Sequence, residues 1–126
     1  MNADVNGQVT VEEELHQLDE AVALSRVGGD SDLLKEIVEL FLSDYPGTLE
    51  KIRSAVATRD AAALEHHAHS LKGSVSTFGA QHAFDAALEL ERKGRSGDLA
   101  GVEDGLGQLE FALGALRPEL EVIQAR

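Results

Sequence analysis

Apolar residues recur along most of the chain at spacings of three and four, the period of an amphipathic helix. The longest such run starts after Gly28-Gly29-Asp30-Ser31, where the glycines end one helix and Asp30 or Ser31 caps the next. Pro46 lies inside this run and must either kink the helix or break it. Because the stripe continues in phase beyond the proline, we expect a kink. The stripe consists of Leu34, Val38, Phe41, Tyr45, Leu49, Ile52 and Val56.

Three further helices are predicted after this run. Asp60 is placed to cap the first, and Gly79 ends it. The next runs from about Ala80 to Lys93 and is ended by Gly94 and Gly97. Asp98 caps the last, which Pro118 kinks without ending. The apolar stripe of the first of these helices is Leu64, Ala68, Leu71, Val75 and Phe78. That of the second is Ala83, Phe84, Ala87, Leu88 and Leu90. That of the last is Leu99, Val102, Leu106, Leu109, Leu113, Leu116, Leu120 and Ile123.

The pattern does not fix where the N-terminal helix begins. Residues 1–9 are polar and show no period, which predicts a flexible arm. Thr10-Val11-Glu12-Glu13 matches a capping box, so a helix could run from there to about Arg26. Asp19 could equally cap a shorter helix that starts at Glu20, and the pattern does not decide between them.

These elements predict an all-α protein. No segment alternates like a strand, and short connections between the later helices favour antiparallel neighbours. We therefore expect an antiparallel up-and-down four-helix bundle with an additional short N-terminal helix. The arm would occupy residues 1–9 and the bundle domain residues 10–126.

Composition restricts the possible functions. The chain contains no cysteine, which excludes disulfides and thiolate metal sites, and it lacks a signal peptide and a membrane-spanning run. We therefore expect a cytoplasmic protein without a membrane partner. The net charge is −12, and eleven basic residues scattered among twenty-three acidic ones form no basic face for nucleic acid. A protein partner is expected instead.

Three of the five histidines lie on the helix that follows Asp60. Turning about 100° per residue from the centre of its apolar stripe, we place His67 about 60° away, at the edge of the core. His69 lies about 140° away on the opposite flank, and His66 lies on the far side. His69 is thus predicted to face solvent or a partner.

The neighbours of His69 on its own helix suggest a phosphoryl carrier. They are Ala62, Glu65, Lys72, Gly73 and Ser76, several of which are small. Imidazole is an accepted covalent nucleophile, and the Lys72 ammonium lies one turn away, where it could steady an anion. Gly73 costs helix stability without evident structural gain, as residues at functional sites often do.

The wider string resembles a known family. Ala68-His69-Ser70-Leu71-Lys72-Gly73-Ser74 followed by Phe78-Gly79-Ala80 is similar to the signature of histidine-containing phosphotransfer (HPt) domains. That signature is a His, a Lys three residues later, a Gly four later, a small residue next, and a Gly ten after the His. The resemblance covers roughly residues 18 to 123.

The resemblance implies a four-helix bundle in which His69 accepts a phosphoryl group from the aspartyl phosphate of one receiver domain and passes it to another. Lys72 would steady the phosphate, and Gly73, Ser76 and Glu65 would lie at the partner contact. The expected partners are receiver domains of response regulators and of a hybrid sensor histidine kinase. The protein would be a monomeric carrier without an ATP site, a metal or a cofactor, and Mg²⁺ would belong to the receiver. Family members often have a Gln where this chain has the acid Glu91, so that role is not transferred.

Parts of the sequence are also compatible with other kinds of protein or site. A histidine kinase dimerisation domain would have an acid and a proline where Ser70 and Ser74 stand. The phosphotransfer domain of a chemotaxis kinase has a similar string but continues into kinase domains; Met1 favours a complete small protein. His66 and His69 could chelate a metal with Glu65 and His82, although no recognised zinc spacing is present. A purely structural interaction bundle is the last alternative.

Overall fold

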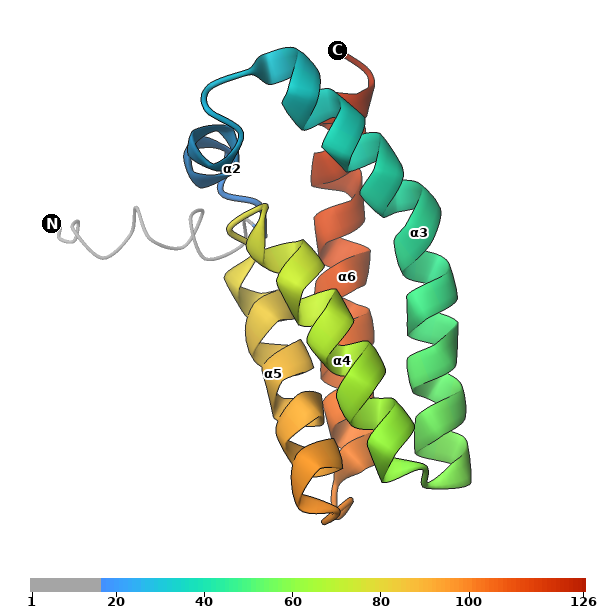
Figure 1. The fold of residues 1–126 in the computed structure, drawn as a ribbon. Coiled ribbons are helices and arrows are strands. Elements are labelled where there is room, and N and C mark those ends of the chain that lie inside the picture. Colours follow the sequence, from blue (N-terminus) through green and yellow to red (C-terminus); the bar gives the residue numbers. More distant parts are fainter. Residues whose placement is uncertain (1–16) are drawn as a thin grey trace, which may run out of the picture.

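The computed structural model describes residues 17–126, which form five helices and no strand. Four of the helices lie side by side in a bundle, and the shortest lies across one end (Figure 1). Neighbouring pairs close a ring, because α3 and α5 each pack against both α4 and α6. This confirms the predicted four-helix bundle with a short N-terminal helix. The helices are α2 (Glu20–Arg26), α3 (Ser31–Thr58), α4 (Ala61–Ser76), α5 (Gln81–Ser96) and α6 (Val102–Gln124).

The N-terminal helix takes the shorter of the two predicted forms. Asp19 caps α2, and its carboxylate accepts a hydrogen bond from the Val22 N–H at 3.1 Å. The Asp19 N–H in turn donates to the Phe78 carbonyl at 3.0 Å, which ties α2 to the end of α4. The predicted arm at residues 1–9 and the capping box at residues 10–13 lie outside the described residues.

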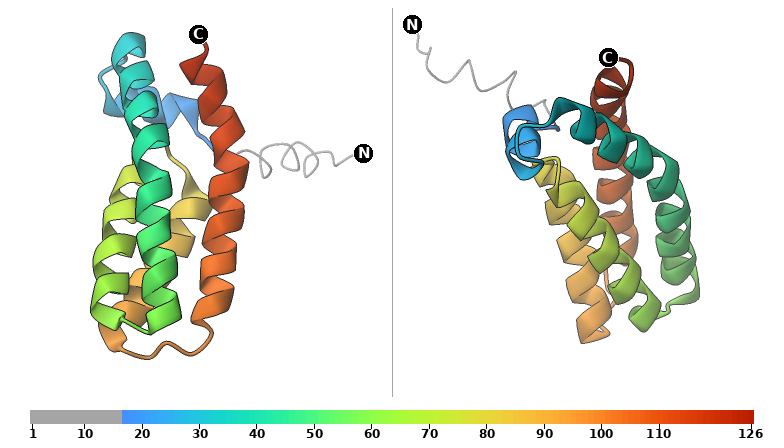
Figure 2. Two further views of the ribbon diagram at one scale, coloured as in Figure 1. Left: turned by 90° about the vertical axis from the view of Figure 1, so that its right-hand side faces the viewer. Right: turned by 45° about the horizontal axis from the view of Figure 1, so that its top comes forward.

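The long helix α3 follows its predicted stripe. Asp30 is the cap and accepts a hydrogen bond from the Leu33 N–H at 3.0 Å. All seven stripe residues from Leu34 to Val56 are buried. The helix continues through Pro46 and bends in its middle, as the right-hand view of Figure 2 shows. The expected kink is therefore confirmed.

Two predicted helix boundaries are wrong. Gly94 does not end α5; it is buried within the helix, and Gly97 with a φ of 78° is the C-cap. Asp98 does not cap α6, because its carboxylate accepts from the Ala100 N–H at 3.2 Å and closes a local turn instead. Gly101, at a φ of 73°, occupies the cap position of α6.

The apolar stripe of the last helix is as expected. It continues through Pro118 to Gln124, and most of its leucine stripe is buried in the core. None of the helices among residues 17–126 is long and apolar enough to cross a membrane.

Candidate functional site

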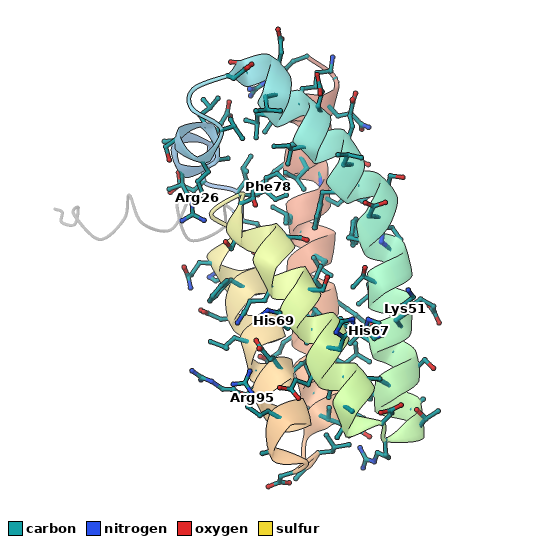
Figure 3. All side chains as sticks on the ribbon, in the orientation of Figure 1. Arg26, Lys51, His67, His69, Phe78 and Arg95 are labelled. Atoms are coloured by element: carbon teal, nitrogen blue, oxygen red, sulfur yellow. The ribbon has the colours of Figure 1, made fainter. Side chains whose placement is uncertain are left out.

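The three histidines of α4 separate as the helical geometry predicts. His69 projects from the flank of α4 that borders α5, and 65% of its side chain is exposed. His67 is half-buried on the other flank, toward α3, and Figure 3 shows the two side chains on opposite edges of the helix. His66 is exposed. Of the three, only His69 stands where it can combine exposure with contacts from a second helix.

Small residues bring that second helix close to His69. Gly94 of α5 lies directly against the backbone of α4, where a Cβ atom would come within 2.6 Å of the Glu65 amide nitrogen and 2.7 Å of the Ala61 carbonyl oxygen. Ala83 and Ala87 lie on the same buried stripe of α5. The two backbones therefore approach closely, and a side chain of α5 can reach under the exposed face of α4.

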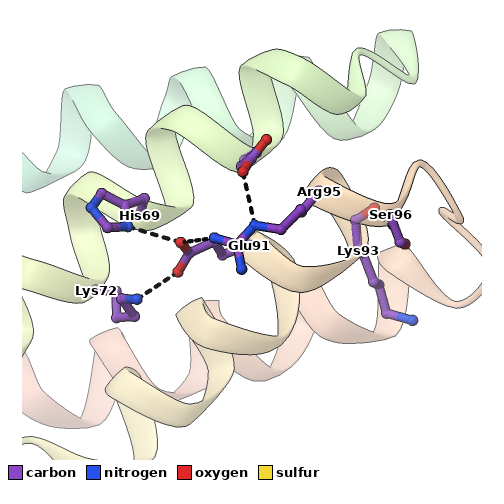
Figure 4. Close-up of polar contacts among 7 residues, drawn as sticks. His69, Lys72, Glu91, Lys93, Arg95 and Ser96 are labelled. Atoms are coloured by element: carbon purple, nitrogen blue, oxygen red, sulfur yellow. Dashed lines mark hydrogen bonds and ion pairs between the residues drawn. The ribbon is translucent and has the colours of Figure 1, made fainter.

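Glu91 is the side chain that does so. Its carboxylate is 2% exposed and lies 2.8 Å from His69 Nδ1. Lys72 Nζ lies 2.7 Å from Glu91 Oε1 as an ion pair, and an Arg95 guanidinium nitrogen lies 2.7 Å from Oε2 (Figure 4). A buried carboxylate thus joins the histidine to two cations.

The cations keep this carboxylate charged. The Lys72 ammonium lowers the pKa of Glu91 below its ordinary value, burial opposes that change, and the contact with His69 lowers the pKa further. Since an ordinary glutamate is already ionised at neutral pH, Glu91 carries a negative charge there. A buried charge of this kind persists only when its partners are held in place, as these are.

The predicted site residues are only partly brought together. Lys72 and His69 both contact the Glu91 carboxylate. The Lys72 side chain also passes over the Phe84 ring, with Nζ 6.0 Å from the ring centroid. Glu65 joins the same cluster, because its carboxylate accepts from Arg95 Nε at 3.0 Å. Gly73 adjoins Lys72 on the exposed surface, where a Cβ would meet no neighbouring segment within 4 Å.

Ser76 lies apart from this cluster. It is at the end of α4, and Arg26 of α2 donates hydrogen bonds to its carbonyl and hydroxyl oxygens. The structure thus groups Glu65, Lys72 and His69, and leaves Ser76 at the junction with α2.

A shallow depression lies on the other side of Gly73, between α3 and α4. Leu40 is 63% exposed at this depression and is its most exposed apolar side chain. The lining residues are Ile37, Leu40, Phe41, Asp44, Tyr45, Thr48, Ser70, Leu71, Ser74, Thr77 and Phe78. This surface combines apolar and small polar groups close to Gly73.

The alternative assignment was a metal site that included His66 and His69. Within residues 17–126, no group of three or more His, Cys, Asp and Glu side chains is placed to hold a metal ion. His66 and His69 are both exposed on α4, but the carboxylate that contacts His69 is engaged by two cations.

Sequence reasoning missed the contacts of Glu91 and the part played by Arg95. In the sequence, Glu91 is noted only as an acid where family members often have a Gln, and Arg95 is assigned no role. A signal was present, since Ala87, Glu91 and Gly94 are spaced by four and three residues and so place an acid beside a buried stripe. An acid at such a position needs cationic partners.

Comparison with known proteins agrees with this arrangement. Residues 36–124 match the family model described as the Hpt domain. The crystal structure of histidine-containing phosphotransfer protein B (HptB) from Pseudomonas aeruginosa PAO1 is similar, with a TM-score of 0.80 and 29% sequence identity. The match covers 87% of this chain and 96% of that one. No curated protein matches the chain.

Proposed function

Since the chain belongs to the Hpt domain family, whose members are phosphocarrier modules that meet receiver domains in phosphorelays, we propose that His69 is its phosphoacceptor. His69 takes a phosphoryl group from the aspartyl phosphate of one receiver domain and yields it to the aspartate of another. The donor belongs to a hybrid sensor histidine kinase and the acceptor to a response regulator. The chain acts as a monomer, and the receiver provides Mg²⁺ and most of the catalytic groups.

The observation that carries this proposal is the combination of exposure and anchoring at His69. Its side chain is 65% exposed, so a partner can reach the ring, while Nδ1 is held 2.8 Å from a buried carboxylate. A nucleophile that must meet an aspartate on another protein needs both properties. His66 and His67 each lack the anchoring contact or the exposure.

The transfer step can be written with these groups. A ring nitrogen of neutral His69 attacks phosphorus with its lone pair, the N–P bond forms, and the P–O bond to the receiver aspartate breaks. The aspartate leaves as a carboxylate with the bonding electrons. The reverse sequence on a second receiver regenerates neutral His69. Lys72 lies one turn from His69, and its ammonium offsets part of the negative charge of the phosphoryl group.

The receiver docks over Gly73. The open space at Gly73 lets a second backbone approach the helix, and the depression between α3 and α4 provides apolar contact through Leu40 and Ile37. Glu65 and Ser76 lie toward the two ends of this contact surface on α4. Hydrophobic contact flanked by polar groups is typical of such transient interfaces.

Replacing His69 tests the assignment. We expect the His69→Gln variant to take up no label from a phosphorylated receiver domain, because an amide cannot form the N–P bond. The matched control is His66→Gln, which removes an exposed histidine three residues earlier on α4 and should be labelled like the wild type. Labelling of His69→Gln at the wild-type rate would show that another residue is the acceptor.

A further inference from the structure

Phe111 of α6 is the most exposed large apolar residue among residues 17–126, with 78% of its surface accessible. The phosphotransfer step described above does not use it. Gly107 and Gly114 lie one turn before and one turn after it, and a Cβ at either would meet no other segment within 4 Å. Glycine within a helix costs stability relative to alanine. The two glycines leave the Phe111 ring open to a partner along the helix.

Phe111 borders a groove of about 930 Å³ between α5 and α6. The buried small residues Ala86, Gly105 and Ala112 lie at its base. Along α5 the groove extends from His82 to Lys93, which is about 16 Å at 1.5 Å per residue. A helix of about three turns fits this length, and a helix laid in a groove between two others is a common mode of recognition.

The walls of this groove are acidic. Lys93 is the only lysine or arginine in the lining, and it pairs with Glu89 at 3.6 Å. Glu103 pairs with Arg59, which lies outside the groove, and the two aspartates of the lining have no cationic partner within residues 17–126. Four carboxylates and one ammonium attract a partner with cationic side chains. The acidic residues are Asp85, Glu89, Glu103 and Asp104.

We propose that the groove between α5 and α6 is a second docking surface, which binds a basic amphipathic helix of another protein with Phe111 as the apolar anchor. Cationic side chains on the flanks of that helix meet the acidic walls. A second copy of this chain fits less well, because its net charge of −12 brings like charges together. The inference goes beyond phosphotransfer and does not depend on which residue is phosphorylated.

The groove lies on a different side of α5 from His69. At about 100° per residue, Asp85, Glu89 and Lys93 project from the side of α5 opposite to Glu91. Glu91 contacts His69 of α4. A helix in the groove therefore leaves both flanks of α4 accessible, and it tethers the carrier while receiver domains exchange at His69.

A synthetic helical peptide of about 18 residues, with leucine on one face and lysine on the other, tests the surface. Titrated into the ¹⁵N-labelled full chain, it should shift the amide signals of residues that line the groove. Signals around Leu40, in the depression between α3 and α4, should not move. The same peptide with glutamate in place of lysine should not bind, because the walls are acidic. Failure of the lysine peptide to bind, or shifts confined to the depression, would overturn the proposal.

Phe111→Ser measures the contribution of the ring. We expect it to weaken the lysine peptide about tenfold in calorimetric titration, as the loss of an aromatic anchor commonly does. Leu40→Ser is the matched control, since it removes another exposed apolar side chain on a different face, and it should bind the peptide like the wild type. Both positions are exposed, so both variants should fold. Equal affinity of Phe111→Ser and the wild type would contradict the role of Phe111.

Asp104→Asn measures the contribution of charge. We expect it to weaken the peptide about threefold, because one carboxylate of the groove is neutralised. Asp32→Asn is the control: it makes the same change in charge in the first turn of α3, as Asp104→Asn does in the first turn of α6. It lies outside the groove and should not change the affinity. Equal weakening by both variants would mean that the net charge of the chain, and not the groove, attracts the peptide.

Two other occupants of the groove are distinguished by the free full chain. A dimer seen by sedimentation that Phe111→Ser dissociates would assign the groove to a second copy. Nuclear Overhauser contacts between Phe111 and residues 1–16 would assign it to the chain's own N-terminal segment. Either result would overturn the proposal. We expect neither, and we expect Phe111→Ser to be labelled at His69 by a phosphorylated receiver at the wild-type rate.

Discussion

The two flanks of α4 are built in opposite ways. Toward α5 the contact is made by small residues, and the backbones come so close that Gly94 has no room for a Cβ. Toward α3 large rings are present: Phe78, just past the end of α4, packs edge-on against Phe41 of α3 at 5.2 Å between centroids, and Phe41 stacks on Tyr45 of its own helix at 5.0 Å. The close flank holds an anchored histidine, and the wide flank leaves a surface depression.

This difference separates two tasks on one helix. A close helix pair fixes a side chain from a neighbouring helix to within hydrogen-bond distance, as Glu91 does for His69. A wider pair, spaced by large side chains, exposes apolar surface such as Leu40 that a partner can cover. We infer that α4 positions its nucleophile with one flank and receives the receiver domain with the other.

The largest effect is expected from a substitution at Gly94 that disrupts the close contact between α4 and α5. A methyl group there would lie 2.6–2.9 Å from backbone atoms of α4 that cannot move away singly. We expect Gly94→Ala to lower the free energy of unfolding by about 2 kcal/mol, because overpacking outweighs the gain in helix propensity. Urea unfolding followed by circular dichroism measures it. The control is Gly114→Ala on α6, where a Cβ would meet no other segment within 4 Å, and which should be at least as stable as the wild type.

A smaller effect of opposite sign is expected at Gly73, the glycine on the exposed face of α4. A Cβ there meets nothing in this chain, so Gly73→Ala should raise the free energy of unfolding by about 0.5–1 kcal/mol. The same methyl group should obstruct the receiver and weaken its binding about tenfold, a cost of about 1.4 kcal/mol. Urea unfolding and titration of a receiver domain measure the two quantities.

Gly114→Ala again provides the comparison for Gly73→Ala. It should give a similar gain in stability without a loss of receiver affinity. If Gly73→Ala bound the receiver as tightly as Gly114→Ala, the docking surface would have to lie elsewhere on the bundle.

The sequence was sufficient to predict the helices because each must bury an apolar stripe with a regular period. The stripe of α3 is buried as predicted on both sides of Pro46. The exposure of His69 also followed from the period of one helix. Boundaries failed where local hydrogen bonding competed: Asp98 resembles a cap but closes a turn with Ala100.

The surroundings of His69 could not be predicted in the same way, because they depend on the distance between two helices. That distance is set by Gly94, which sequence reasoning treated as the end of a helix and which instead lies buried in α5 against α4. Once the helices touch, Glu91 lies beneath His69 and meets Lys72 and Arg95. The charge of Glu91 was visible in the sequence, but its partners belong to the tertiary structure.

The smallest effect is expected at His67, on the flank of α4 that faces α3. Burial lowers the pKa of the His67 imidazole, the neighbouring His66 and Lys51 lower it further, and Asp60 opposes them (Figure 3 shows Lys51 and His67). The folded state therefore disfavours a proton that the unfolded chain accepts below about pH 6.5. Above that pH the shift has no effect on stability, and as pH falls below it the unfolded state binds more protons and the free energy of unfolding declines.

We expect His67→Gln to remove this decline, so that the difference in unfolding free energy between wild type and variant is flat above about pH 6.5. Below that pH the wild type should lose a further few tenths of a kcal/mol, on the order expected for a half-hydrated group. Lys51→Gln should reduce the decline without abolishing it, because burial remains the larger cause. Urea titrations between pH 5 and 8 give these differences. An equal decline in His67→Gln and wild type would mean that the flank toward α3 admits enough water to solvate a charged ring. That flank would then be open around His67 as well as at the depression near Gly73.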